Sequence, residues 1–365
     1  MKQNVVISNQ IDETLSEAIA ASPYDKIFLL TDTVTEQLCW PLVEQVKALS
    51  GAPHIVIGAT DTHKTLETLA GVWKQLGDGG GTRHSLLVNL GGGMVTDLGG
   101  FAASTFKRGI RYINVPTTLL SMVDASVGGK TGINFNGLKN EIGVFNAAST
   151  VILDTEFLRT LDAENICSGY AEMLKHGLIS TPEHLQELLA WPLEHADKLQ
   201  KNELRALGAM VGRSVAVKER IVEQDPHEMG IRKALNLGHT VGHAFEAFSL
   251  RQAEESVGTP QAHQPILHGY AVAYGLVCEL YLSCRKTGFP IDLMRQCVAF
   301  IKENYGVLPI TCDDYPELYA YMQHDKKNTA GTINFTLLGG VGDIHINQTA
   351  TQEEIYEMLD FFREG

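Results

Sequence analysis

The N-terminal part of the chain alternates short β-rich apolar runs with stretches whose apolar positions recur at helical spacing. The runs that predict strands are residues 4–8, 26–32, 54–59, 85–93, 111–117 and 150–154. Strands that alternate with helices are typical of an α/β domain whose sheet is mostly parallel. We therefore expect such a domain at residues 1–158.

The pattern changes near Thr160, where strand signals nearly vanish and long amphipathic stretches begin. The stretches that predict helices are residues 203–223, 232–249, 269–286 and 352–363. The polar segment 250–265 interrupts the helical spacing and predicts a surface loop, while the apolar run 332–340 predicts a small hairpin. A mainly α-helical domain is therefore expected at residues 159–365.

Composition narrows the class of protein without changing the predicted fold. The chain has 365 residues, enough for two domains of about 150 residues each. Its net charge of −14 disfavours broad binding to nucleic acid or to an anionic membrane surface. Six scattered cysteines without a CxxC pair, no secretory signal and no run long enough to span a bilayer predict a cytoplasmic protein.

A glycine-rich loop follows one of the predicted strands. Residues 89–100 read NLGGGMVTDLGG, so an apolar run leads into Gly91, Gly92 and Gly93 and then into a helical stretch. Such a loop lets backbone amides approach a pyrophosphate, although a strand-to-helix turn without ligand has the same pattern. Asp32 ends an earlier strand and is a candidate for ribose hydroxyls. It precedes the glycines, whereas the Rossmann fingerprint places its acid about 20 residues after them, so we expect a non-standard Rossmann-like order.

Histidines and a carboxylate form a candidate metal constellation. His239 and His243 are four residues apart and share one helical face, and His268 begins another predicted helix. Glu172 lies in an apolar, small-residue stretch where a lone carboxylate needs a partner. Two imidazoles and one carboxylate give zinc three ligands and an open position, as in catalytic sites. A single histidine of this kind is usually structural, and spacing alone leaves open which two bind.

Several cations stand in weakly charged, glycine-rich surroundings. They are Lys130, Lys139, Lys175 and Arg232. Each alone is typical of a solvated side chain, but together they indicate a pocket for a small, multiply anionic substrate. Asp124 is either a turn residue or a ligand for substrate hydroxyls.

The motifs taken in order resemble the 3-dehydroquinate synthase family of the sugar phosphate cyclase superfamily. The resemblance runs from about residue 25 to 345, and its most specific parts are VDASVGGKTGIN at 123–134 and LNLGHTVGHAFE at 235–246. Membership implies a dehydroquinate synthase-like fold with an NAD-binding α/β domain, a helical zinc-binding domain and an active site between them. It also implies a homodimer, with Arg108 reaching the neighbouring subunit's site.

The resemblance implies a role for individual residues. Glu172, His239 and His268 become the zinc ligands, with cobalt as a substitute, and His243 moves to substrate contact and proton handling. The residues implied to contact the substrate are Asp124, Lys218, Lys130, Lys139, Asn140, Lys175, Arg232, Asn236 and one of Lys326 and Lys327. The residues implied to line the NAD site are Asp32, Asp61, Lys64, Gly91, Gly92, Gly93, Asp97, Thr117, Thr118, Lys130 and Lys139.

The chain departs from the family pattern at a few positions. Asp61 replaces a glutamate, Leu138 a frequent glycine, and Tyr270 an acid that commonly follows His-Gly. The loop between His243 and His268 is also longer than usual.

The implied activity is a lyase reaction of the shikimate pathway, which leads to chorismate and the aromatic amino acids. It converts 3-deoxy-D-arabino-heptulosonate 7-phosphate to 3-dehydroquinate and phosphate without net redox change. One alternative is another cyclase, of the 2-deoxy-scyllo-inosose or epi-valiolone synthase type, but Arg232 with Asn236 favours a carboxylated substrate. A second alternative is a zinc-dependent polyol dehydrogenase of the glycerol dehydrogenase type. The cluster of cations disfavours it, because a polyol carries no negative charge. A non-catalytic NAD- and metal-binding protein is the third.

Overall fold

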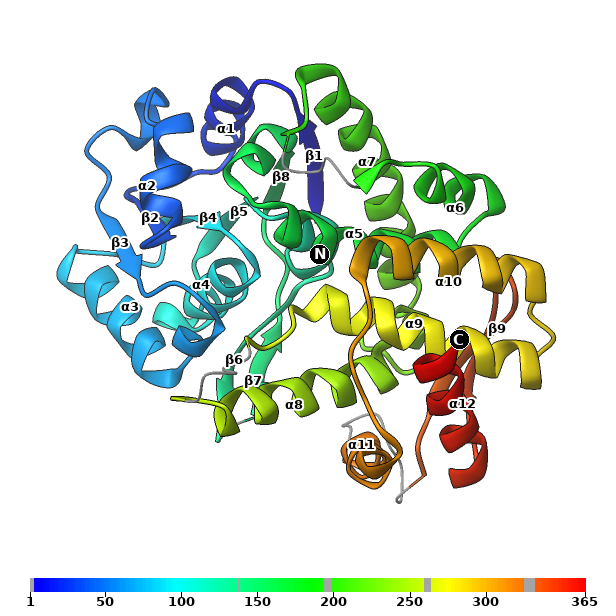
Figure 1. Ribbon diagram of the computed structural model, residues 1–365. Coiled ribbons are helices and arrows are strands. Elements are labelled where there is room, and N and C mark those ends of the chain that lie inside the picture. The colour runs from blue at the N-terminus through cyan, green and yellow to red at the C-terminus, as the bar shows by residue number, and fades with distance from the viewer. Residues whose placement is uncertain (1–2, 137, 194–197, 259–263, 325–331) are drawn as a thin grey trace. The chain divides into compact units, whose positions relative to one another are not determined.

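The computed structural model describes residues 3–136, 138–193, 198–258, 264–324 and 332–365 (Figure 1). The chain forms two compact units, whose residues are Met1–Asp162 with Asp197–Glu219 and Ala163–Ala196 with Arg220–Gly365. They are called unit 1 and unit 2 below. None of the described helices combines the length and apolarity needed to cross a membrane.

Unit 1 contains a six-stranded sheet in which every neighbouring pair is parallel. Its strands are β1 (Asn4–Ser8), β2 (Ile27–Asp32), β3 (His54–Ile57), β4 (Leu86–Gly91), β5 (Arg111–Pro116) and β8 (Thr150–Asp154). Each lies within a run that predicts a strand, and β2, β4 and β8 are buried along their whole length. The order β1-β8-β5-β4-β2-β3 confirms the predicted α/β class and its departure from the Rossmann arrangement.

The helices of unit 1 connect successive strands, as parallel pairing requires. They are α1 (Ile11–Ala20), α2 (Thr35–Leu38), α3 (Leu66–Asp78) and α4 (Gly93–Thr105). Helix α4 packs across β2, β4 and β5. The short helical turns are η1 (Trp40–Leu42), η2 (Lys47–Leu49), η3 (Asp61–His63), η4 (Phe106–Arg108), η5 (Ser121–Ala125) and η6 (Thr155–Thr160).

A hairpin that the sequence pattern did not predict lies between β5 and β8. It consists of β6 (Lys130–Phe135) and β7 (Leu138–Phe145), which pair antiparallel. The pattern missed it because every residue of β7 is exposed, so no alternation of buried and exposed positions marks the strand.

Unit 2 is a helical assembly around α9 (Figure 1). The helices that begin after Asp162 are α5 (Ala163–Leu178), α6 (Pro182–Leu189), α7 (Lys201–Gln224), α8 (His239–Glu255), α9 (His268–Lys286), α10 (Ile291–Tyr305), α11 (Tyr315–Gln323) and α12 (Gln352–Glu364). Helix α9 packs against α5, α8, α10 and α12, and α7 contributes residues to both units. Two short turns, η8 (Ile231–Asn236) and η9 (Cys312–Asp314), also lie in this part of the chain.

Three local predictions in the second half of the chain are corrected by the structure. The stretch 232–249 is not one helix, because Gly238, with φ of +79°, separates η8 from α8. Helix α8 continues to Glu255, so the predicted loop 250–265 is helical at its start, and residues 259–263 lie outside the described part. The late hairpin pairs β9 (Phe335–Gly340) with β10 (Asp343–Gln348), a strand beyond the predicted run.

Close backbone contacts at glycines bring α5, α8 and α9 together. A Cβ atom on Gly275 of α9 would lie 1.9 Å from the carbonyl oxygen of Gly238, which precedes α8. A Cβ on Gly269, near the start of α9, would lie 1.8 Å from the carbonyl oxygen of Ser168 on α5. No other residue type fits at either position without a backbone shift.

We expect Gly275→Ala to lower the free energy of unfolding by about 1–3 kcal/mol, because the added methyl group collides with a backbone atom that cannot rotate away. Gly71→Ala, in the interior of α3 with open space around it, is the matched control and should stabilise the protein by about 0.5–1 kcal/mol. Urea unfolding followed by circular dichroism measures both. Equal changes in the free energy of unfolding at Gly275 and Gly71 would contradict the close approach of Gly275 to the Gly238 carbonyl oxygen.

Candidate active site

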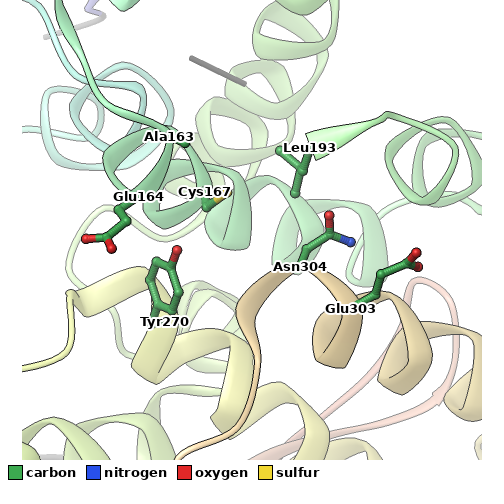
Figure 2. Close-up of a pocket in the computed structure, with 7 residues that line it drawn as sticks. All are labelled: Ala163, Glu164, Cys167, Leu193, Tyr270, Glu303 and Asn304. Atoms are coloured by element: carbon green, nitrogen blue, oxygen red, sulfur yellow. The ribbon is translucent and has the colours of Figure 1, made fainter. Parts of the chain in front are cut away.

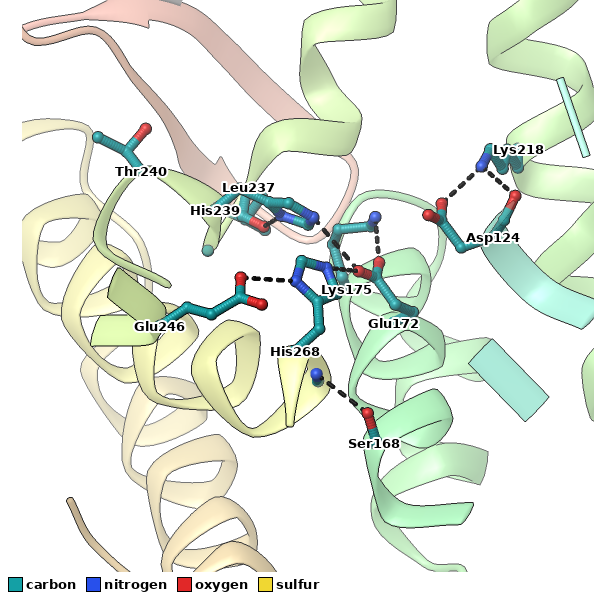
Figure 3. A network of polar contacts seen from close by, with 12 residues as sticks. Asp124, Ser168, Glu172, Lys175, Lys218, Leu237, His239, Thr240, Glu246 and His268 are labelled. Atoms are coloured by element: carbon teal, nitrogen blue, oxygen red, sulfur yellow. Dashed lines mark hydrogen bonds and ion pairs between the residues drawn. The ribbon is translucent and has the colours of Figure 1, made fainter. Parts of the chain in front are cut away.

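A carboxylate and two imidazoles converge in unit 2 (Figure 3). The Oε1 atom of Glu172, on α5, is 3.2 Å from His239 Nε2 and 3.4 Å from His268 Nε2. His239 is the first residue of α8 and His268 the first residue of α9, so three helices contribute one side chain each. Ligand atoms of the three side chains lie within 4.8 Å of one another. Two imidazole nitrogens and a carboxylate oxygen fit zinc and leave a coordination position open.

Cations compensate the buried carboxylate of this cluster. The side chains of Glu172 and Lys175 are 0% and 1% exposed, and the Lys175 ammonium pairs with the carboxylate across one turn of α5. Burial would raise the pKa of Glu172, but Lys175 and His239 outweigh it and hold the pKa well below its ordinary value. Burial would lower the pKa of His268, yet hydrogen bonds with Glu172 and Glu246 raise it to about 10. The cluster without metal is therefore a charged network.

A second buried carboxylate, from Glu279 on α9, holds the start of α8. Its oxygens accept the backbone N–H groups of Gly238 at 2.7 Å, Thr240 at 3.1 Å and Val241 at 3.3 Å. Helix α8 has no side-chain cap of its own, so Glu279 satisfies amides that would otherwise lack partners. Because negative charge is favourable at a helix N-terminus, the contact fixes the backbone on both sides of His239.

His243 lies one turn after His239 on α8. Its ring centroid is 5.5 Å from that of His239 and 6.1 Å from that of His268. Among the described residues, no group of side chains close enough to hold a metal includes His243. The geometry thus brings His268 rather than His243 to Glu172 and His239.

The turn η8 places two of the predicted anion-binding residues. Arg232 is 2% exposed, and its Nη1 donates to the carbonyl oxygen of Pro226 at 2.6 Å. The Nδ2 atom of Asn236 donates to Glu228 Oε1 at 2.9 Å. The carboxylate of Asp225 accepts the backbone N–H of Arg232 at 3.1 Å and so closes the turn.

The predicted pyrophosphate loop lies at the carboxyl ends of two neighbouring parallel strands of unit 1. Strand β2 ends at Asp32, and its neighbour β4 ends at Gly91. Helix α4 begins at Gly93 without a side-chain cap, which leaves its first backbone N–H groups open to an anion. A Cβ on Gly92 would lie 3.1 Å from Thr118 Cγ2, so a larger residue would narrow the turn. Ligands of open α/β sheets bind at such a position.

Lys64 connects α4 with the β6–β7 hairpin. Its Nζ is 2.6 Å from Asp97 Oδ2 and also donates to Asn140 Oδ1. The backbone N–H of Asn140, which has a φ of +52°, donates to Asn134 Oδ1 at 2.9 Å, and Asn134 Nδ2 donates to Asp61 Oδ2 at 2.9 Å. Burial raises the pKa of Asp97, and the Lys64 ammonium opposes part of that rise. Asn134 thus joins Asp61 to the network of Asn140, Lys64 and Asp97, all four of which are predicted site residues.

Asp124 and Lys218 form a further ion pair within unit 1. The Lys218 Nζ is 2.5 Å from Asp124 Oδ1 and donates to the Asp124 carbonyl oxygen at 2.5 Å (Figure 3). Asp124 lies in the π-helical turn η5, and such turns occur often at functional sites.

Other predicted residues lie at the edge of these clusters. Lys130 and Lys139 are exposed on the hairpin, and Lys139 Nζ is 3.9 Å from Asp61 Oδ2. Thr117 donates its backbone N–H to the carbonyl oxygen of Gly91 at 3.0 Å.

Arg108 lies in the exposed turn after α4, apart from these networks. Arg108 and Lys107 both have left-handed backbone conformations, with φ of +72° and +48°. Lys326 and Lys327 lie outside the described residues.

A separate pocket of about 210 Å³ lies elsewhere in unit 2 (Figure 2). Its lining residues are Ala163, Glu164, Cys167, Leu193, Tyr270, Glu303 and Asn304. Tyr270, one of the residues that depart from the family pattern, therefore faces this pocket. Burial raises the pKa of both Cys167 and Tyr270 and so disfavours a thiolate or phenolate there. None of the predicted site residues lines it.

Several residues around the site were not predicted from the sequence. Among them, Asn134, Glu228 and Glu246 contact predicted site residues, and Glu279 binds the amides on either side of His239. Glu246 had a usable signal, because it lies on the same helical face as His239 and His243 at i and i+7 spacing. Glu279 had a weaker one, as a lone acid within an apolar helical stretch. Nothing local to Asn134 or Glu228 indicates their partners.

Among solved structures, the chain is similar to a 2-epi-5-epi-valiolone synthase from Streptomyces hygroscopicus subsp. jinggangensis with NAD+ and Zn2+ bound. The TM-score is 0.81 at 25% identity, and the similarity covers 100% of this chain and 97% of that one. The fold and the residue clusters define the class, which is that of the sugar phosphate cyclases.

Sequence comparison narrows the class to one family. Residues 54–168 match the family model for the 3-dehydroquinate synthase N-terminal part, and residues 169–328 match that for its C-terminal part. A 3-dehydroquinate synthase from Parabacteroides distasonis is 53% identical over 364 residues, covering 100% of this chain and 99% of that protein. One from Clostridium tetani is 33% identical over 335 residues, covering 92% and 85%. The chain belongs to the 3-dehydroquinate synthase family.

We expect Lys175→Met to lower the free energy of unfolding of the metal-free protein by about 3–5 kcal/mol, because the buried Glu172 carboxylate loses its ammonium partner. Lys74→Met is the matched control: it breaks a helical ion pair with Asp78 whose side chains are 75% and 66% exposed. That variant should unfold almost as the parent does. Urea titrations in the presence of a chelator measure both, and equal losses would show that Glu172 does not need the cation.

Proposed function

We propose that the chain converts 3-deoxy-D-arabino-heptulosonate 7-phosphate to 3-dehydroquinate and inorganic phosphate. The observation that carries the proposal is the convergence of Glu172, His239 and His268 beside the buried ammonium of Lys175. Family membership makes this reaction the one to test first. The reaction is a lyase step, because the hydride removed early is returned later and no net oxidation occurs.

Zinc and NAD are the cofactors that we propose for this chemistry. Glu172, His239 and His268 would hold the metal, and the glycine turn with Asp32, Lys64 and Asp97 would hold the dinucleotide. When bound, NAD accepts and returns the hydride, while zinc stabilises the negative charge that develops on the substrate's hydroxyl oxygen. Support comes from the donor set and from the open N-terminus of α4.

The chain's own residues bind, orient and exchange protons. Lys175 and Arg232, almost fully buried, supply fixed positive charge for an anionic substrate, and Asn236 adds hydrogen bonds beside Arg232. The Asp124–Lys218 pair presents an acceptor and a donor to ring hydroxyls. His243 is the candidate proton carrier, because a neutral imidazole can both donate and accept a proton near pH 7.

This proposal favours the carboxylated substrate over the alternatives. A planar guanidinium binds a carboxylate through two parallel hydrogen bonds, which suits Arg232 to a substrate acid group. A neutral polyol carries no acid group and would make no such pair of hydrogen bonds with the guanidinium. The thiols of all six cysteines are free, in keeping with work in the reducing cytoplasm.

Incubation of the purified protein with the heptulosonate phosphate, catalytic NAD and zinc should release phosphate and form dehydroquinate in equal amounts. Absorbance at the NADH wavelength should show no lasting rise, because the hydride returns to the substrate. A heptulose phosphate without the carboxylate and glycerol are the comparison substrates. Faster phosphate release from the heptulose phosphate would favour another sugar phosphate cyclase. Steady NADH formation with glycerol would favour a polyol dehydrogenase.

We also propose that the chain acts as a homodimer in which Arg108 serves the neighbouring subunit. Arg108 is exposed and held in a turn of left-handed residues, which fixes its direction at a backbone cost. Leu138 and Phe145, at the two ends of β7, are 53% and 54% exposed and offer apolar surface for a second copy.

Mixing two inactive variants tests the shared site. Arg108→Ala and Glu172→Gln should each be inactive alone, but heterodimers formed by co-expression contain one intact site. Because half of randomly paired dimers are mixed, roughly a quarter of parent activity should return. Sedimentation of the parent protein reports the dimer itself. No recovery from co-expressed variants that sediment as dimers would place Arg108 in its own subunit's site.

A further inference from the structure

The two ring nitrogens of His268 face two different carboxylates (Figure 3). Nε2 is 3.4 Å from Glu172 Oε1, in the proposed metal site, whereas Nδ1 is 3.2 Å from Glu246 Oε2. Glu246 comes from α8, two helical turns after His239, and its side chain is 15% exposed. Helix α8, which carries the proposed ligand His239, therefore also contributes a side chain that contacts His268, the proposed ligand on α9.

A neutral imidazole can bind a metal only through the nitrogen that carries no proton. A carboxylate beside Nδ1 keeps the proton on that atom and directs the Nε2 lone pair toward Glu172. We propose that Glu246 is a positioning residue that fixes the tautomer and ring orientation of His268 and thereby strengthens zinc binding. The inference rests on the proposed metal site, and it adds a residue to which no role was assigned above.

The contrast with His239 shows what Glu246 adds. His239 also presents Nε2 to Glu172, but its Nδ1 lies 3.1 Å from the backbone carbonyl oxygen of Leu237. That carbonyl is fixed by the chain immediately before α8 and carries no net charge. The carboxylate of Glu246 is an anion, so it increases the basicity of the His268 ring as well as orienting it.

The place of His268 in the fold explains why an external partner is needed. It is the first residue of α9, its side chain is 28% exposed, and the residue before it offers no side-chain cap. A helix N-terminus carries partial positive charge, which opposes a cation bound nearby. A carboxylate on the far side of the ring offsets that charge and restrains the rotation of the imidazole.

Zinc affinity of the apoprotein tests the inference without relying on turnover. We expect Glu246→Ala to weaken zinc binding by about 10- to 100-fold, the usual cost of losing an outer carboxylate partner. Glu246→Gln should weaken zinc binding less, because the amide oxygen still accepts a hydrogen bond from Nδ1–H although it carries no charge. Titration against a competing chromophoric chelator gives the affinities. The absorption spectrum of the cobalt-substituted protein should shift in the Ala variant and return toward the parent spectrum in the Gln variant.

Two controls separate this inference from the proposed metal site. Glu254→Ala alters an exposed acid on the same helix and should bind zinc as the parent does. His268→Ala removes a proposed ligand and should lose more affinity than either Glu246 variant. If the parent binds no zinc, or His268→Ala binds it as the parent does, the metal site itself fails and the inference fails with it.

The remaining outcomes concern Glu246 alone. If the parent and His268→Ala behave as expected but Glu246→Ala binds zinc within twofold of the parent, Glu246 has no positioning role. If the Ala variant is unfolded by circular dichroism, the Gln variant decides. Reduced affinity with a native fold supports the role, and an unchanged affinity together with an unchanged cobalt spectrum overturns it.

Discussion

The cluster around Glu172 depends on the close approach of helices α8 and α9, because each contributes its first residue to it. The two backbones meet at Gly238 and Gly275, where no side chain fits between them. Glu279 then binds the first amides of α8 from the body of α9. The separation of the two histidines is consequently set by backbone packing and one buried carboxylate, which are much stiffer than a side chain on a loop.

That packing creates an electrostatic difficulty that acidic residues resolve. Two helix N-termini and the Lys175 ammonium concentrate positive charge where the proposed metal would add more. Glu172, Glu246 and Glu279 supply the opposing charge: Glu172 pairs with Lys175, Glu246 contacts His268, and Glu279 accepts backbone N–H groups at the start of α8. Glu172 and Glu246 also contact the two opposite nitrogens of one ring, that of His268. A cation at this position is favourable only because they surround it.

The sequence predicted the parts of this arrangement that depend on local pattern. Six strands lie where β-rich runs predict them, and the four-residue spacing correctly puts His239 and His243 on one helical face. Spacing did not reveal that His268, rather than His243, approaches Glu172, because that contact depends on the packing of three helices. The β6–β7 hairpin escaped detection for a different reason: its second strand buries no residue and leaves no periodic trace. Tertiary contacts and exposed strands lie beyond pattern analysis.

The order of the candidate dinucleotide residues along the chain follows from the topology of the sheet. In a Rossmann sheet the acid stands on the strand that follows the glycine loop. Here β2 precedes β4 in the chain but lies directly beside it, so Asp32 and Gly91 end neighbouring strands at the same edge. The acid can therefore come first in the sequence and still lie beside the glycines. Adjacency of parallel strands, and not separation along the chain, decides which side chains a bound dinucleotide can reach, so an unusual motif order is weak evidence against such a site.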